Sequence, residues 1–270
     1  MRALLAIAAF GFASGCVAYN DQCKPLVDNP DEKIATTGET IYMDRPNTRH
    51  ANNGFGQVFS ESFVEVFANS GQPADFAVLN GGSLRAEGVC VTRNVIGNNT
   101  PVTNGLVSEI LLFANIVQAA DLKETEVVLM FEHSVERLFP SGTTISSPAG
   151  SFLQVSKGVN MTVDCSRPAG DRITALTING AAVTKPGLDT KRYRVAMSSF
   201  ILAGNDGYTM LAGKGEDPDR RPAQAQKLGG IDSAIAADYL KRTFASGGSI
   251  TTEKTRVNFV NCAVPVPPTN

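Results

Sequence analysis

The 270-residue sequence contains few of the side chains that catalytic and metal centres most often use. Only two histidines, His50 and His133, occur in it, and tryptophan is absent. Histidine is a common general base and the commonest metal ligand. No His-Glu-x-x-His, Gly-x-Ser-x-Gly or phosphate-loop sequence is present either. We therefore predict no catalytic residue, no metal ligand and no cofactor in this chain, and we interpret His133 as a solvated or packed residue of a helix.

Charge of one sign is not in excess, because the formal net charge is −2 and the pI is about 5.8. Proteins that bind nucleic acid present a basic patch or stripe, so no nucleic-acid partner is expected. Beyond residue 18 no apolar run approaches the roughly 20 residues that cross a bilayer. The sequence therefore predicts no transmembrane segment.

The first 18 residues have the pattern of a secretory signal. Met1-Arg2 is followed by the uncharged run "ALLAIAAFGFASGCVA", and a basic start, a short apolar centre and a small-residue exit are typical of such signals. We predict a signal peptide at 1–18, a polar segment at 19–37, and a secreted or periplasmic location. Lipoprotein anchoring at Cys16 is the less favoured alternative, because Ala13 stands where that motif usually has leucine. A buried helix is the other alternative.

The cysteines predict disulfides rather than a metal site. No Cys-x-x-Cys pair is present, which argues against zinc bound by cysteine. Cleavage after residue 18 leaves an even number, as is common in an oxidising compartment. These four allow three pairings, and the sequence does not choose among them: Cys23, Cys90, Cys165 and Cys262.

Hydrophobic periodicity indicates one mixed α/β domain over 38–262, followed by a disordered proline-rich tail at 263–270. No internal repeat or linker interrupts it. Helices are expected at 56–71, 123–139 and 231–244, with a short helical pattern from 104. Strands are expected at 39–44, 74–80, 114–121, 152–165, 172–180, 192–199 and 256–260.

The segment "LNGGSLR" (79–85) ends a predicted buried strand in two glycines and then supplies an arginine. Glycine lets a backbone approach a ligand closely, and free N–H groups at such a turn can face an anion. Arg85 could then make a forked contact to phosphate or sugar oxygens. The alternative is a simple chain reversal.

Two aromatics at the edges of apolar runs, Phe113 and Phe200, are candidates for a clamp on a flat ring. Core packing is the alternative, since it accounts for most phenylalanines. Asp206 follows in "FILAGNDGYTML" and could accept hydrogen bonds from two neighbouring hydroxyls. An exposed turn aspartate is the alternative for that position.

Taken together, the segments resemble the C-terminal domain of secreted 5′-nucleotidases, the family that includes ecto-5′-nucleotidase and periplasmic UDP-sugar hydrolase. The likeness runs in order from about residue 38 to 260. It includes these stretches: "GQVFSESF", "ADFAVLNGGSLR", "LLFANIVQAADLKETEVVLMFEHSV", "GSFLQVSKGVNMTVD", "PAGDRI", "YRVAMSSFILAGNDGYTML" and "DSAIAADYL".

The resemblance implies a nucleoside-recognition domain, whose catalytic partner is a separate metallophosphoesterase domain with two metal ions and a catalytic histidine. Phe113 and Phe200 would sandwich the base, and Asp206 would accept the ribose hydroxyls. The remaining substrate-binding positions implied are Asn80, Gly82 and Arg85 on the sugar and phosphate side, and Arg49 as another substrate-binding arginine.

The chain departs from the family pattern beside these positions. Ala114 follows the first ring where the family has glycine, and Asn205 replaces a glycine before Asp206. Asparagine tolerates a left-handed backbone, should that position need one. Gly56-Gln57 and Glu61 replace the Gly-Asn and Asp of the first helix.

Three functions remain open at this point. The first is recognition of a nucleoside or 5′-nucleotide for hydrolysis by a metallophosphoesterase domain in trans. The second is a free-standing secreted nucleoside binder, and the third is a structural or interaction module with an inactive pocket. A complete nucleotidase within this chain ranks last, since two histidines are too few for the usual ligands of a two-metal site.

Overall fold

The computed structural model describes residues 27–69, 71–85, 94–215 and 230–268. The predicted signal peptide at 1–18 lies outside the described residues, and so do Cys16, Cys23 and Cys90. Within the described ranges no helix combines the length and apolar character that crossing a membrane requires.

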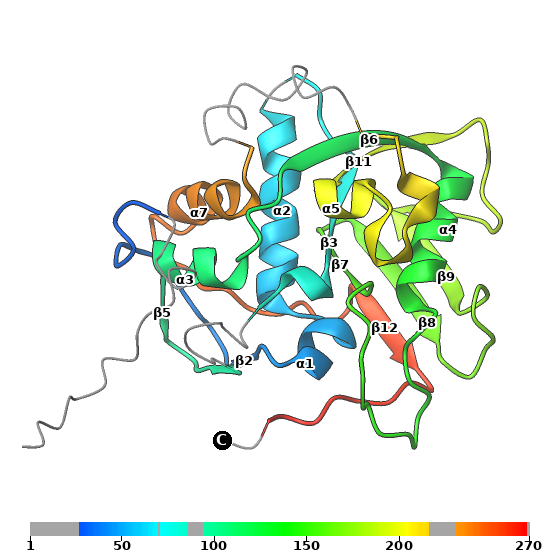
Figure 1. Ribbon diagram of the computed structural model, residues 1–270, viewed down its shortest axis with the longest axis horizontal. Helices are drawn as coiled ribbons and strands as arrows, with labels where there is room; N and C mark the ends of the chain where they lie inside the picture. Colours follow the sequence, from blue (N-terminus) through cyan, green and yellow to red (C-terminus); the bar gives the residue numbers. More distant parts are fainter. Residues whose placement is uncertain (1–26, 70, 86–93, 216–229, 269–270) are drawn as a thin grey trace, which may run out of the picture.

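A four-stranded sheet lies at the centre of the molecule, in the order β6-β11-β3-β7 (Figure 1). Its strands are β3 (Phe76–Asn80), β6 (Val117–Lys123), β7 (Leu153–Val155) and β11 (Arg192–Ser198). β3 and β11 are parallel, whereas β6 and β7 run antiparallel to their neighbours. Every residue of β3 is buried, as expected for a strand that is covered on both faces.

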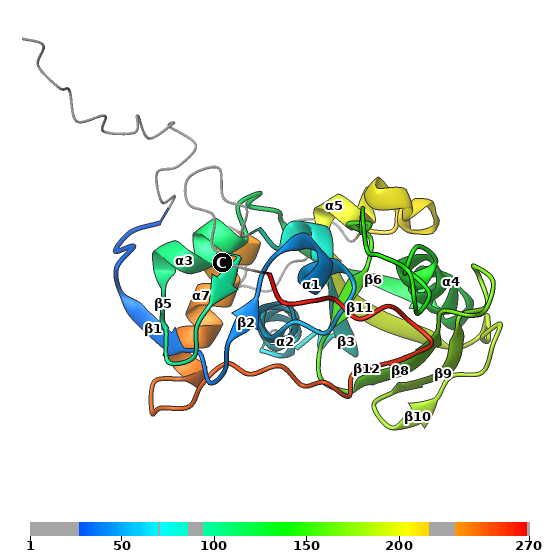
Figure 2. The same cartoon turned by 90° about the horizontal axis from the view of Figure 1, so that it is seen from below.

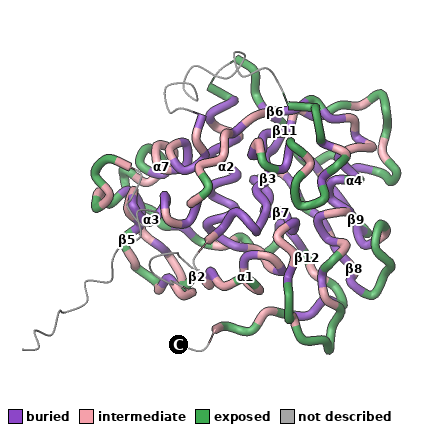
Figure 3. Tube along the Cα trace, viewed as in Figure 1, coloured by how far each residue is buried: buried purple, intermediate pink, exposed green. Residues whose placement is uncertain are grey.

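One face of this sheet is covered by helices α2 (Gly54–Ala68), α3 (Asn104–Ile110) and α7 (Asp232–Thr243) (Figure 2). Phenylalanines recur along α2 at positions that pack on this face, and the alternate residues Ala77 and Leu79 of β3 meet them. The Asn53 side chain begins α2 by accepting hydrogen bonds from the amides of Phe55 and Gly56. Figure 3 shows the buried trace along α2, β3 and β7.

The other face packs on α4 (Glu124–Val135) and on a second four-stranded sheet, in the order β10-β9-β8-β12. These strands are β8 (Val159–Asp164), β9 (Ile173–Ile178), β10 (Ala181–Ala182) and β12 (Val257–Val260). Phe76 and Val78 of β3 point into this second core, opposite to Ala77 and Leu79. The period-2 alternation of a strand thus divides the core into two halves.

Short elements complete the chain. β1 (Lys33–Thr36) pairs with β5 (Pro101–Thr103), and β2 (Ile41–Tyr42) pairs with β4 (Val95–Ile96). Single turns of helix connect the larger elements: α1 (Arg45–Arg49), η2 (Gly81–Ser83), α5 (Ser199–Leu202), η3 (Asn205–Gly207) and η4 (Thr209–Leu211).

The predicted mixed α/β class is confirmed, but several element boundaries were wrong. The stretch 152–165 forms two strands of different sheets, because a turn through Gly158, whose φ is 96°, separates β7 from β8. The strand predicted at 114–121 begins later, at Val117. The helix predicted to reach 139 ends at Val135, where Arg172 donates hydrogen bonds to the carbonyls of Val135 and Leu138, at 2.9 and 2.7 Å.

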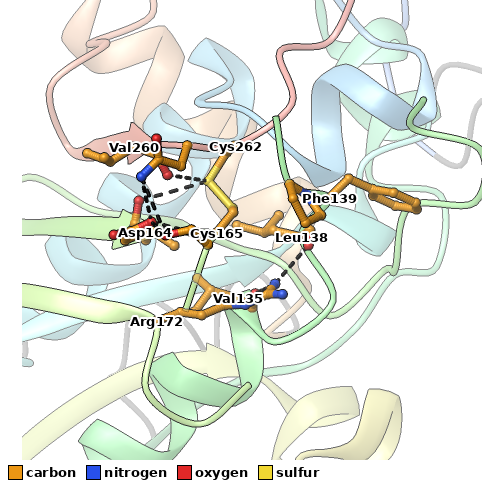
Figure 4. The surroundings of a disulfide bond; sticks show 12 residues. Val135, Leu138, Phe139, Asp164, Cys165, Arg172, Val260 and Cys262 are labelled. Carbon is orange, nitrogen blue, oxygen red and sulfur yellow. Dashed lines mark hydrogen bonds between the residues drawn. A yellow bond between two sulfur atoms is a disulfide. The ribbon is translucent and has the colours of Figure 1, made fainter. Parts of the chain in front are cut away.

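Of the three cysteine pairings that the sequence left open, the structure contains Cys165–Cys262. This disulfide joins the end of β8 to the chain just after β12, beside the Arg172 contacts (Figure 4). The Ala263 amide donates to the Phe139 carbonyl at 2.8 Å, which attaches the following segment to the same corner. The disorder expected over 263–270 stays a prediction.

Candidate functional site

All four strands of the central sheet end or begin at one edge. β3 and β11 are parallel, so their carboxyl ends meet there; β6 and β7 are antiparallel to them, so their starts lie at the same edge. Ligands of open α/β sheets bind outside the carboxyl ends of the strands. The loops at this edge are therefore where the fold places a binding site.

A cavity of about 480 Å³ opens at this edge. All seven residues predicted from the sequence line it, together with three that sequence reasoning did not assign to the site. The lining residues are Arg49, Asn80, Gly82, Ser83, Arg85, Phe113, Asn115, Gly150, Phe200 and Asp206. The three additions are Ser83, Asn115 and Gly150. The first two adjoin predicted residues along the chain, whereas nothing in the sequence around Gly150 indicated a site.

The segments around Thr48 and Gly150 approach the turn after β3 closely, which explains the two glycines of that turn. A Cβ on Gly81 would overlap the Thr48 carbonyl, and one on Gly82 would lie 3.0 Å from the Cα of Gly150. The amides of Gly81 and Gly82 donate to the carbonyls of Phe152 and Gly150, at 2.6 and 2.9 Å. The hypothesis of free N–H groups at both glycines was therefore wrong, because these two groups bind the chain itself.

Asp206 is connected to the end of β3 by a side-chain network. Asn80, which is almost fully buried, donates from Nδ2 to Oδ2 of Asp206 at 2.9 Å. Its Oδ1 accepts a hydrogen bond from the Ser83 hydroxyl at 2.6 Å, which fixes the orientation of the amide. Asp206 Oδ1 has no hydrogen-bond partner among the described residues. One carboxylate oxygen thus anchors the side chain, and the other remains available at the cavity.

The loop that carries Asp206 has a left-handed backbone. The φ angles are 87° at Gly204, 52° at Asp206 and 86° at Gly207. Asn205 is not among the positive-φ residues, so the left-handed role considered for it is not needed. Instead its Nδ2 donates to the Phe200 carbonyl at 3.0 Å, which ties the loop to the segment bearing that ring.

Core packing does not explain the two rings. Phe113 is 53% exposed and Phe200 is 36% exposed, whereas most phenylalanines among the described residues are fully buried. Ala114, directly after Phe113, has a φ of 49° where the family pattern has glycine. A left-handed alanine is strained by roughly 1–2 kcal/mol, so the turn that presents Phe113 is maintained against a local preference.

Two arginines line the same cavity. The Arg85 guanidinium lies over the Phe113 ring, with Cζ 4.8 Å from the centroid. Its Nε is buried and has no hydrogen-bond partner among the described residues. Arg49, the last residue of α1, donates from Nη1 to the Pro148 carbonyl at 3.2 Å. Among the described residues Asp206 is the only acidic one that lines the cavity, so the cavity favours an anionic group near the arginines.

Metal ligands do not come together in the ranges that the structure describes, where no group of three or more His, Cys, Asp or Glu side chains is placed to hold an ion. His50 is buried, and its Nε2 accepts the Phe139 amide at 2.6 Å. Burial lowers the pKa of His50, which favours this neutral form. The residue is a structural acceptor.

A buried acid lies directly behind Asn115. The Asp232 amide donates to the Asn115 carbonyl at 2.9 Å, and the side chain of Asp232 is fully buried at the start of α7. Burial raises the pKa of Asp232 to about 7, against hydrogen bonds from Ser233 and Asn115 that favour the charged form. The carboxyl group therefore changes charge near neutral pH.

Comparison with known proteins identifies the family. The family whose sequence model matches residues 33–213 is described as "5′-nucleotidase, C-terminal domain". This match covers more than half of the chain, and the chain belongs to that family. The resemblance inferred from the sequence motifs is thereby confirmed.

Similar proteins are considerably longer than this chain. A trifunctional nucleotide phosphoesterase protein of Bacillus subtilis is 26% identical over 226 residues, which is 82% of this chain and 14% of that protein. A snake venom 5′-nucleotidase of Crotalus adamanteus is 28% identical over 178 residues, which is 64% of this chain and 27% of the relative. The crystal structure of a 5′-nucleotidase precursor from Thermus thermophilus superposes with a TM-score of 0.65 at 28% identity, over 85% of this chain and 40% of that one. The chain thus spans well under half of each.

Proposed function

We propose that this domain recognises a nucleoside or 5′-nucleotide in the cavity at the central sheet edge. The observation that carries the proposal is that seven residues, scattered from 49 to 206 along the sequence, line one cavity. A volume of about 480 Å³ lies within the roughly 300–1,000 Å³ of small-molecule sites. The family membership supports the same class of ligand.

Each part of the ligand has a matching group. The base stacks between Phe113 and Phe200, whose exposure leaves ring faces open to it. The ribose hydroxyls donate to the carboxylate of Asp206. Phosphate oxygens meet Arg85 and Arg49, whose guanidinium groups bind phosphate in a forked geometry.

Hydrolysis, in this proposal, requires a metallophosphoesterase domain that supplies two metal ions, either from a longer form of the protein or in trans. The relatives have several times the length of the matched region, which is room for such a domain. We further propose a secreted or periplasmic location. The disulfide Cys165–Cys262 supports it, since disulfides persist mainly in oxidising compartments.

Calorimetric titration of the mature chain, residues 19–270, with adenosine and AMP tests the proposal. We expect Phe113→Ala and Phe200→Ala each to weaken binding by about 1–3 kcal/mol, the usual loss of one stacked base. Asp206→Ala should weaken both ligands, whereas Arg85→Met should weaken AMP more than adenosine.

Leu188→Ala is the matched control, because Leu188 is as exposed as Phe113 but does not line the cavity. Its affinity should equal that of the parent. Failure of the parent to bind either ligand would refute recognition by the isolated domain and favour a structural module. Binding that survives the Phe200→Ala, Asp206→Ala double variant would place the ligand elsewhere.

A further inference from the structure

His133, for which the sequence indicated only a solvated or packed role, lies against the loop that carries Asp206. It stands in the last turn of α4, which leaves the far end of β6 and returns to the site edge. Its Nε2 is 2.8 Å from the backbone carbonyl oxygen of Asp206. A carbonyl can only accept, so Nε2 carries the hydrogen and donates it. Nδ1, on the other side of the ring, lies 3.2 Å from Oε1 of Glu136.

The Asp206 loop depends on polar contacts such as this one, because no buried side chain holds it in place. None of the three residues of η3 is buried, so hydrophobic packing does not fix their positions. The left-handed φ of Asp206 is unfavourable for a residue other than glycine. A strained and exposed turn of this kind persists only when its surroundings determine its conformation.

The imidazole also shapes the loop by direct contact. A Cβ on Gly207 would lie 2.6 Å from Cε1 of His133, so the loop backbone packs on the ring. The ring meets Tyr208 edge to face, with centroids 4.7 Å apart and planes at 82°. Tyr208 is fully buried, and its hydroxyl donates to the Ser151 carbonyl. His133 thus joins the exposed loop to the buried residue that follows it.

We propose that His133 is a positioning residue for Asp206, an inference that rests on the proposed function for its ligand. Two elements hold the aspartate: Asn80, at the end of β3, binds the carboxylate, and His133 of α4 binds the main chain. His133 does not touch the carboxylate and lies outside the cavity lining. His133 affects the binding of a ribose diol only because it fixes the position of Asp206.

A set of substitutions separates the hydrogen bond from the ring contact. His133→Gln retains an N–H donor near the Nε2 position and removes the ring, whereas His133→Phe retains a ring and removes the donor. His133→Leu removes both. Leu129→Ala is the control, since Leu129 lies on α4 and is exposed to solvent.

The ligand-bound readout compares adenosine with 2′,3′-dideoxyadenosine, which lacks the diol. We expect His133→Phe and His133→Leu to lose about 3–10-fold in affinity for adenosine, the usual effect of one hydrogen bond, and to bind the dideoxy ligand like the parent. His133→Gln should stay within about 3-fold of the parent for both ligands. Equal losses for the two ligands, or an equal loss in His133→Gln, would overturn the proposal.

The ligand-free readout is hydrogen exchange of the backbone amides at 204–208. Exchange should accelerate in His133→Phe and His133→Leu, remain near the parent rate in His133→Gln and Leu129→Ala, and be unchanged in β8, which reports global folding. Unchanged exchange in the two donor-free variants would refute the anchoring role. If the parent binds neither ligand, the proposed function fails by itself, and this measurement still decides the role of His133 in the loop.

Discussion

The exposure and backbone angle of single residues distinguish binding roles from structural ones in this domain. Phe113 and Phe200 are aromatic like the buried rings of α2, yet they remain open at the cavity rim. Ala114 maintains a left-handed backbone next to one of them, and Asp232 is an acid buried behind Asn115. Two of these residues, Ala114 and Asp232, oppose local stability, which makes their effects measurable.

Ala114→Gly should stabilise the domain. Glycine adopts a φ of 49° without the clash that Cβ creates, although it also increases the entropy of the unfolded chain. We expect a net gain of about 0.5–1 kcal/mol in the free energy of unfolding, measured by urea denaturation. Ala203→Gly is the control, since Ala203 has a φ of −76° and should lose stability. A lower urea midpoint for Ala114→Gly would contradict the strain argument.

Asp232→Asn should remove a pH-dependent loss of stability. Burial raises the pKa of Asp232 from 3.8 to about 7, so between these values the folded chain retains a proton that the unfolded chain releases. The free energy of unfolding therefore decreases as the pH rises from about 4 to 7 and levels off above. The contribution reaches up to about 4 kcal/mol at pH 8.

The measurement is urea unfolding of the parent and Asp232→Asn between pH 4 and 8. The difference between them should increase with pH in favour of the variant, while Asp31→Asn, which alters an exposed carboxylate, should follow the parent. A difference that does not vary with pH would show that Asp232 ionises as freely in the folded state as in the unfolded one.

At the scale of elements, a disulfide and hydrogen bonds join one corner of the second four-stranded sheet to neighbouring segments. The end of β8, the turn after α4 and the chain after β12 meet there through Cys165–Cys262, Arg172 and the Ala263 amide (Figure 4). This corner does not line the cavity, which lies at the edge of the central sheet. Stability and binding can therefore be altered separately.

Replacing both Cys165 and Cys262 by serine should lower stability without changing ligand affinity. The crosslink spans 97 residues of chain, and removing a native disulfide typically costs about 2–4 kcal/mol. Thermal unfolding and calorimetry of the double variant measure the two quantities. A loss of ligand affinity as large as the loss of stability, measured below the unfolding transition, would mean that the corner and the cavity are coupled.

At the scale of the whole molecule, the domain contains the cavity proposed to bind a nucleoside, and within the described residues no metal-ligand cluster accompanies it. The two histidines of the chain are both engaged, His50 with the Phe139 amide and His133 with the Asp206 carbonyl. A two-metal phosphoesterase needs several free ligands of this kind.

The purified chain should release no phosphate from AMP, even with added Zn²⁺ or Mn²⁺, because the proposed function assigns the two-metal site to a separate metallophosphoesterase domain. Phosphate release in a colorimetric assay measures this directly. Addition of a metallophosphoesterase domain from a related 5′-nucleotidase is the positive arm, and activity there should disappear with Phe200→Ala, Asp206→Ala. Metal-dependent turnover by the chain alone would contradict the proposed division of roles.

Local pattern and composition in the sequence predicted the class of fold and most of the helices and strands, and the family resemblance supplied the full set of seven candidate residues. Periodicity identifies elements because each buries one face, and turn residues mark their ends. Motifs in order along the chain were sufficient to identify the family, because the positions that meet a ligand demand particular residue types.

Only the tertiary structure decided how these parts meet. The parallel pairing of β3 with β11, and the antiparallel pairings of β6 with β11 and of β7 with β3, bring four distant chain segments to one edge. Such pairings depend on long-range contacts that no local window contains. For the same reason the pattern around His133 indicated a helix surface and not the Asp206 loop, and the cysteines did not reveal their pairing. A hydrogen bond across 73 residues becomes visible only when the chain is folded.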